Sequence, residues 1–474
     1  MLRKGNLGFN VFGPEQCAEV HSAALEVLER VGVEIHSEKA LEVARKAGAF
    51  VDGSRARFPA ALVEKSIRSA PSRVVLCDRD GARAMQLEGE RFYYGPGPTA
   101  IYTIDPVTGE RKIPGVADTQ LASRVMDALP NIDYQMDFGS IGDVDPKIMD
   151  VVAFDAMLNN STKPIVHWAY TTRNCQAMID MAAEAAGGLA KLQASPTFAI
   201  YSEPVSPLMH EADALDVAML MAEKNLPAIY TPAPLAGATA PATLAGTIVI
   251  SLCESLSGLV LHQSVREGAP FIMGGVITIL DMSATQICYG GPEFMLMAAG
   301  LTEMAQYYQI PSFSTAGCSD AKSCDGQHAA EIGQNLLVAA LSGANLIHDC
   351  GYMESGNCTS LQALVIADEL IGQVKRIARG IEVDEETLAL DVIAAVGPGG
   401  DFMRQRHTKQ HYRSEWFFPT LLSRGRHQDW ADSGKPDLAD RAQKKLLGII
   451  AGHEAPLLDA DTQKKVRAIV DGLR

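Results

Sequence analysis

The chain has 474 residues and a formal net charge of −16 at pH 7, with 47% hydrophobic and 21% charged residues. This length and composition predict a large buried core and exclude a single small domain. The negative charge would repel phosphate backbones and disfavours nucleic-acid binding, and no basic amphipathic segment indicates a membrane surface.

The chain ends and cysteines favour a cytoplasmic protein. The N-terminal segment MLRKGNLGFNVFG lacks the apolar stretch of a signal peptide, and the nine cysteines include no CxxC pair. Scattered cysteines of this kind are typical of reduced thiols. The longest apolar run, Leu244–Leu261, contains Glu254 and several serines and glycines, so it predicts a buried helix and no membrane span.

Residues 1–115 are predicted to form an N-terminal helical and β-hairpin extension. Apolar residues recur at helical spacing over Pro14–Val31, and two further helices are expected in SEKALEVARKAGA and FPAALVEKSIRSAP. RFYYGPGPTAIYTIDPVTGERK predicts a β-hairpin, with aromatic strands around the Gly-Pro-Gly-Pro bend. Tyr94 and Tyr102 of this hairpin are candidates to cover a binding site.

Residues 116–380 alternate between strand and helix patterns. The predicted strands are 134–144, 164–170, 197–203, 227–233, 270–276, 284–291, 311–317 and 344–351, the sixth of them weak. Helical patterns of ten or more residues separate most of them, so we predict an α/β fold with a closed (β/α)8 TIM barrel. A doubly wound open sheet is the alternative, but the Gly-rich phosphate turn that usually accompanies it is missing.

Residues 381–474 are predicted to form a C-terminal strap and helical tail. The strap includes the basic, aromatic segment HTKQHYRSEWFFP, and DLADRAQKKLLGIIAGH begins the tail helices. Such polar helices suit an exposed or oligomer-facing surface, and we expect a homo-oligomer.

The carboxyl ends of the predicted strands should meet at one end of the barrel, called the mouth below, where ligands bind in this fold. His348, Asp320 and Glu203 are the candidate catalytic residues there. Aromatic rings with one or two carboxylates suit a quaternary ammonium ion, which has no N–H to donate and is held by cation–π contact. The candidate substrate-binding residues are Tyr94, Tyr102, His167, Trp168, Tyr201, Tyr230, Gly274, Gly275, Tyr352 and Glu354. Asp137 also falls at a strand end.

A metal site is an alternative use of the same region. Cys318, Cys324, Cys350 and His348 could supply zinc ligands, but their spacing matches no recognised ligand pattern. We therefore predict no bound metal.

Several long segments resemble one family. EVHSAALEVLERVGVEIHSEKALE, YYGPGPTAIYTID, NSTKPIVHWAY and above all STAGCSDAKSCDGQHAAEIGQNLLVAALSGANLIHDCGYMESG resemble the trimethylamine methyltransferase family over nearly the whole chain. The resemblance is to members without pyrrolysine, which are similar to glycine betaine:corrinoid methyltransferases. The family's archetype carries pyrrolysine for a methylamine substrate, whereas this chain has only the twenty standard residues.

The resemblance implies methyl transfer from a quaternary amine to a Co(I) corrinoid held by a partner corrinoid protein, with no tightly bound cofactor. Glycine betaine is the expected substrate; proline betaine, carnitine and γ-butyrobetaine are alternatives, as is a non-catalytic betaine-binding protein. His348, His167 or backbone amides are candidate donors to a betaine carboxylate, and Glu203 or Glu354 could balance the ammonium. The residue equivalent to pyrrolysine is not assigned.

Overall fold

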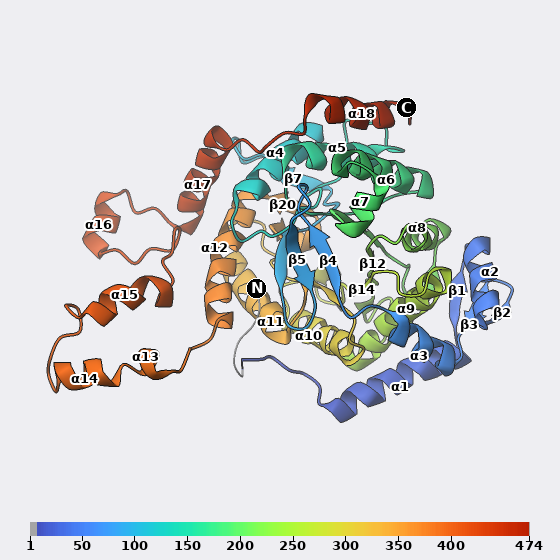
Figure 1. Ribbon diagram of the computed structural model, residues 1–474, viewed down its shortest axis with the longest axis horizontal. Coiled ribbons are helices and arrows are strands. Elements are labelled where there is room, and N and C mark those ends of the chain that lie inside the picture. Colours follow the sequence, from blue (N-terminus) through green and yellow to red (C-terminus); the bar gives the residue numbers. More distant parts are fainter. Residues whose placement is uncertain (1–6, 474) are drawn as a thin grey trace.

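The computed structural model describes residues 7–473 and contains a parallel β-barrel surrounded by helices (Figure 1). Seven strands follow the order β6-β18-β17-β14-β12-β10-β9. Their bounds are β6 Tyr93–Pro96, β9 Ile165–His167, β10 Phe198–Ser202, β12 Ala228–Tyr230, β14 Phe271–Gly274, β17 Ser312–Thr315 and β18 Leu346–Cys350.

An eighth segment closes this sheet between its two edge strands. Gln135 forms a parallel bridge with Ile165 of β9. On the other side, the Asp133 amide donates to the Tyr94 carbonyl of β6, with a nitrogen–oxygen distance of 2.6 Å. The predicted TIM-barrel class is therefore confirmed.

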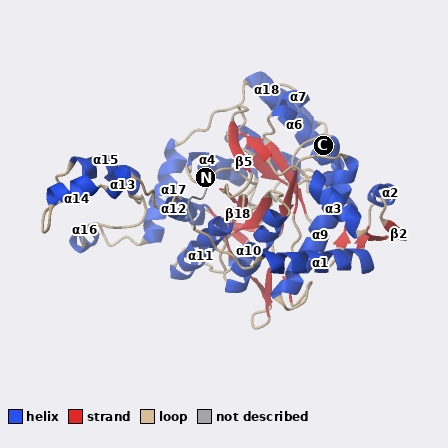
Figure 2. Ribbon diagram, turned by 60° about the horizontal axis from the view of Figure 1, so that its bottom comes forward, coloured by secondary structure: helices blue, strands red, loops and turns tan. Residues whose placement is uncertain are grey.

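Helices cover the barrel from outside (Figures 1 and 2). They are α4 Val116–Ala128, α5 Met149–Asn160, α6 Thr172–Ala186, α7 Leu189–Ala194, α8 Ala212–Glu223, α9 Leu244–Val265, α10 Pro292–Tyr307, α11 Gly326–Ser342 and α12 Leu361–Ala378. The sequence sets several of these bounds. The side chain of Asp325 caps the first turn of α11, and Gly343 ends that helix in the left-handed conformation with φ 86°.

Helix α9 is long and apolar enough to cross a membrane by composition, but most of it is buried inside the protein. It packs between α8, α10 and the N-terminal helices α1 (Pro14–Arg30) and α3 (Ala60–Ser69). This is the buried helix that the sequence predicts, a core element of the fold.

Two predicted strands are placed differently in the structure. Residues 284–291 do not join the barrel: β16 (Gln286–Cys288) pairs antiparallel with β15 (Thr278–Asp281) outside it. The predicted hairpin around Gly-Pro-Gly-Pro is also wrong, because β6 is a barrel strand parallel to β18. The observed hairpin lies further on, between β7 (Tyr102–Ile104) and β8 (Arg111–Lys112).

The remaining strands lie outside the barrel. They are β1 Val33–Ile35, β2 Phe50–Asp52, β3 Arg55–Arg57, β4 Val74–Cys77, β5 Arg83–Leu87, β11 Met209–His210, β13 Leu235–Ala236, β19 Tyr352–Met353 and β20 Cys358–Ser360. β1 to β3 form a small sheet with β11, beside α2 (Glu38–Ala47). The barrel thus takes its first strand from residues 1–115; the division into three domains stays a prediction.

After α12 the chain leaves the barrel and later returns (Figure 1). Residues 381–433, here called the arm, carry four short helices and project away from the barrel (Figure 2). These are α13 Glu385–Leu388, α14 Leu390–Val396, α15 Arg406–Glu415 and α16 His427–Asp432. The tail helices α17 (Leu438–Gly452) and α18 (Ala460–Asp471) then pack on the barrel's helices, α17 against α12 and α18 against α6.

Candidate active site

Three carboxyl groups gather at the mouth from three separate segments. Asp137 follows the closing segment at Gln135, Glu203 follows β10, and Asp349 lies near the end of β18. Burial raises the pKa of Asp349 well above its usual value, and the nearby Glu203 charge raises it further. Burial likewise raises the pKa of Tyr201, with further contributions from the charges of all three carboxyl groups. The three groups therefore share one electrostatic environment.

Asp349 combines two unfavourable features. Its φ of 80° is in the left-handed region, which a non-glycine residue rarely adopts. Its carboxyl is buried, and Oδ1 accepts no hydrogen bond from the described residues. A Cβ on Gly97 would lie 2.6 Å from that oxygen. A strained residue with an unpaired buried oxygen is typical of a functional position.

Glu203 and Tyr201 lie two residues apart at the end of β10, so they point to the same side of the sheet. The Glu203 side chain is exposed by surface area, yet burial raises its pKa to about 7. These observations agree if the carboxyl projects into open space that the surrounding protein shields from bulk water. Glu203 therefore lies at the mouth, on the same side of the sheet as Tyr201, with a raised pKa.

Asp137 is the best-anchored of the three carboxyl groups. Oδ2 accepts a hydrogen bond from Trp168 Nε1 at 2.9 Å, and Oδ1 accepts one from the Thr99 amide at 3.1 Å. Burial nevertheless raises its pKa to about 7, against the effect of these two hydrogen bonds. Asp137 therefore orients the Trp168 ring and is the third carboxyl group with a raised pKa at the mouth.

Aromatic rings accompany the carboxyl groups. Tyr352 belongs to a small buried cluster, and the partly buried Tyr289 packs against it. Burial, followed by the charge of Asp349, raises the pKa of both phenols well above 10. Tyr201 stacks on Phe313 with centroids 6.3 Å apart, and Phe313 stacks on His348 at 4.1 Å. The high pKa values keep the tyrosine hydroxyls protonated, so they can donate hydrogen bonds.

His348 is held in one tautomer. Its Nδ1 lies 2.8 Å from the Ser314 carbonyl oxygen, which can only accept, so Nδ1 carries the proton. Nε2 then presents its lone pair toward Asp349 Oδ1, 3.4 Å away. Burial lowers the pKa of His348 to about 4, so the ring is neutral near pH 7. Nε2 can accept a hydrogen bond from a protonated Asp349 carboxyl, but it cannot donate one to a substrate carboxylate.

Three predicted site residues make hydrogen bonds to elements outside the barrel, two to helices and one to strand β11. The Tyr94 hydroxyl donates to the Leu336 carbonyl of α11, at 2.7 Å. His167 Nε2 lies 2.8 Å from the Asp150 carbonyl oxygen of α5. Tyr230 pairs with His210 at 2.6 Å. The structure does not bring them together with the mouth carboxyl groups.

The remaining predicted residues have structural contacts. Tyr102 lies under the Arg111 guanidinium, which also pairs with Glu354 at 2.8 Å. The Asp320 carboxylate accepts hydrogen bonds from the amides of Tyr289 and Gly290 and from a serine hydroxyl, and so fixes a loop at the mouth.

The glycine pair after β14 allows close packing. A Cβ on Gly274 would overlap with Thr231, and one on Gly275 would overlap with Leu301. Both glycines therefore have a packing reason to be small.

The alternative zinc site does not assemble. Within residues 7–473, the group of three or more metal-ligating side chains at ligand distance lies elsewhere and includes none of Cys318, Cys324, Cys350 and His348. Burial also raises the pKa of the Cys318 and Cys350 thiols well above 9, which disfavours the thiolate form that zinc binds.

Sequence reasoning left out two residues of the mouth as site candidates. Asp349 stood next to His348 in the sequence, but its backbone strain and its unpaired oxygen have no sequence signal. Tyr289 lay inside the segment predicted as the sixth barrel strand. Its position in a polar, glycine-containing loop segment, CYGGP, was the signal available.

Comparison with known proteins decides the family. The model of the trimethylamine methyltransferase (MTTB) family matches residues 2–472. The chain belongs to this family. It is 32% identical to trimethylamine methyltransferase MttB of Desulfitobacterium hafniense, over 99% of this chain and 95% of that protein. It is 29% identical to a glycine betaine methyltransferase of another strain of that species, over 98% and 96% of the two chains.

A solved structure supports the fold. The monomethylamine methyltransferase of Methanosarcina barkeri matches with a TM-score of 0.53 and 13% identity, over 94% of this chain and 90% of that one. This family member is therefore a methyltransferase built on a TIM barrel, and the carboxyl and aromatic cluster lies where such barrels bind substrates.

Proposed function

We propose that this methyltransferase moves a methyl group from a quaternary amine, with glycine betaine as the leading candidate, to a Co(I) corrinoid carried by a partner protein. The observation that carries the proposal is the cluster of Asp137, Glu203 and Asp349 beside the rings of Tyr201 and Tyr352. Such a site suits a cation that offers no N–H donor. The glycine betaine methyltransferase among the relatives supports the substrate class.

The carboxyl groups supply the counter-charge that the ammonium requires. Without a cation, burial raises the pKa of Glu203 and of Asp137 to about 7, so both carboxyl groups are partly protonated near pH 7, and it raises the pKa of Asp349 well above its usual value. A bound ammonium favours their anionic forms, so binding releases protons. Protonated tyrosine hydroxyls are the donors available for a betaine carboxylate, because His348 Nε2 can only accept.

The methyl transfer depends on the positioning of the methyl donor and not on acid–base catalysis. The cobalt nucleophile attacks a methyl carbon; the Co–C bond forms as the C–N bond breaks, and the tertiary amine leaves with the electron pair. No proton moves. The protein holds the ammonium so that one methyl faces the mouth opening, where the partner presents its corrinoid, and it excludes water from the reacting atoms.

The test is methylation of free Co(I) cobalamin, followed by absorbance, with glycine betaine, proline betaine, carnitine, γ-butyrobetaine and trimethylamine as donors. Reaction with one or more quaternary amines supports the proposal and selects the substrate. Reaction with trimethylamine alone contradicts it. Calorimetric binding of a betaine without any methylation would favour the binding-protein alternative.

A further inference from the structure

The second cluster of interest lies in the arm, far along the chain from the mouth. Glu386 comes from α13, and His407 and His411 lie one turn apart on α15. One ligand atom from each side chain lies within 4.8 Å of the others. Residues at i and i+4 share a helix face, so the two imidazoles stand side by side, with ring centroids 4.2 Å apart.

We propose that Glu386, His407 and His411 bind one divalent transition-metal ion of the zinc type, which ties α13 to α15. Two imidazoles and one carboxylate form a common three-ligand zinc set, with water completing the tetrahedron. His411 Nε2 is 2.9 Å from Glu386 Oε1. Two ligand atoms at ~2.0–2.1 Å from a tetrahedral ion stand about 3.3 Å apart, so only a small movement would admit the metal.

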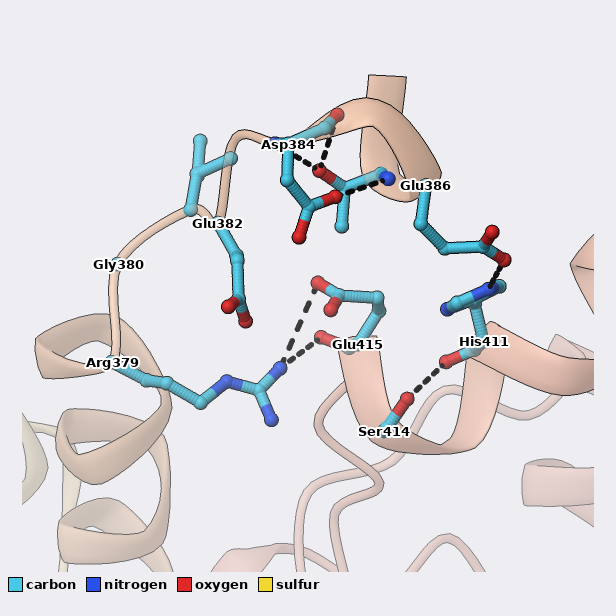
Figure 3. Close-up of a pocket in the computed structure, with 10 residues that line it drawn as sticks. Arg379, Gly380, Glu382, Asp384, Glu386, His411, Ser414 and Glu415 are labelled. Atoms are coloured by element: carbon cyan, nitrogen blue, oxygen red, sulfur yellow. Dashed lines mark hydrogen bonds and ion pairs between the residues drawn. The ribbon is translucent and has the colours of Figure 1, made fainter. Parts of the chain in front are cut away.

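The surroundings favour a cation. A cavity of about 400 Å³ lies beside this cluster and is lined in part by Glu386 and His411. Figure 3 shows the carboxylates of Glu382, Asp384 and Glu415 around it. Arg379 reaches into the same space and pairs with Glu415 at 3.7 Å. Arg376 also pairs with Glu415, at 3.2 Å. Counting Glu386, four carboxylates lie there with two guanidinium groups, so the net local charge is negative and attracts a dication.

A bound ion would stabilise the arm by linking α13 to α15. α13 has four residues and α15 has ten, and both lie outside the barrel core. Hydrogen bonds from His411 and His407 to Glu386 link the two helices, the second at 3.1 Å to the backbone oxygen. A metal that replaces or reinforces these hydrogen bonds would fix the arm, since binding to the folded form stabilises it.

The experiment uses the full chain without a polyhistidine tag. Zn²⁺ is titrated by calorimetry, and Co²⁺ replaces it for the absorption spectrum of a tetrahedral site. We expect one ion per chain, and at least about 100-fold weaker binding in His411→Gln and in Glu386→Gln. His427→Gln, an exposed histidine of α16, is the matched control and should bind as the wild type does.

A second readout follows the arm itself. At a Zn²⁺ concentration ten times the dissociation constant, proteolysis within residues 381–418 should slow about tenfold in the wild type and stay unchanged in His411→Gln. Equal binding by wild type and His411→Gln, or no binding of either ion, overturns the proposal. Neither measurement depends on methyl transfer.

Discussion

The mouth and the arm both gather carboxyl groups and histidines, but in opposite environments. At the mouth, Asp349 is 2% exposed and its Oδ1 has no hydrogen bond from the described residues. In the arm, the Glu386 side chain is 68% exposed and pairs with a histidine. Burial makes the mouth groups costly to ionise, whereas water screens the arm. Similar residues therefore favour bound protons at the mouth and are free to bind ions in the arm.

The largest effect is expected from Asp349→Asn. The side chain keeps its shape but loses the charge that would face the ammonium, so methyl transfer at subsaturating substrate should fall about 100-fold, equivalent to about 3 kcal/mol. Steady-state rates with a betaine donor provide the measurement. Glu354→Gln is the control: its carboxylate pairs with Arg111 near the surface, and its loss should change the rate less than about twofold.

Gly97→Ala should act through the same carboxyl group. An added Cβ would overlap with the Tyr352 ring and approach Asp349 Oδ1 to 2.6 Å, so both side chains must shift. We expect about a tenfold lower rate and about 1–3 kcal/mol lower stability, measured by urea unfolding. Gly333→Ala provides the contrast, because nothing lies within 4 Å of its Cβ on α11, and it should be neutral or slightly stabilising.

The pH dependence of stability tests the raised pKa of Glu203 at the mouth. Burial raises the folded pKa of Glu203 to about 7, while an unfolded Glu titrates near ~4.3. Between these two pKa values the folded chain binds more protons than the unfolded chain does. The contribution of Glu203 to the free energy of unfolding therefore falls as pH rises, and it levels off above about pH 7. Glu203→Gln should therefore gain in Tm relative to wild type from about pH 5 to about pH 8. A constant difference would contradict the raised pKa.

The smallest effect on stability and rate is expected from a substitution in the arm. Glu415 pairs with Arg376 at 3.2 Å and with Arg379, and its side chain is 40% exposed. Glu415→Gln should cost less than about 1 kcal/mol of stability and leave methyl transfer unchanged. Thermal unfolding and the cobalamin assay check this; a large loss of rate would mean that the arm acts on the mouth.

The sequence predicted the barrel because its strands are short apolar runs separated by periodic helices. It missed β6 because Tyr93–Pro96 is followed by glycines and prolines typical of a bend, and its partner β18 lies some 250 residues further along the chain. Residues 284–291 were assigned to the barrel because an exposed antiparallel pair has the same β-propensity as a barrel strand.

The sequence indicates which polar and aromatic residues lie at the strand ends, but it does not indicate which way their side chains point. Strand residues alternate between faces, so one position decides whether a ring meets the mouth or a helix. Tyr201 and Glu203 lie on the inner face, whereas His167 contacts α5 and Tyr230 contacts His210. The strain at Asp349 depends on its φ, which no local sequence pattern specifies.

The most direct measurement compares wild type and Asp349→Asn in methylation of free Co(I) cobalamin by glycine betaine and the other quaternary amines. We expect methylation by the wild type with at least one of these donors, and about 100-fold slower methylation by the variant with the same donor. Equal rates in the two proteins, or reaction with trimethylamine alone, would contradict the assignment of the mouth carboxyl groups to a quaternary ammonium ion.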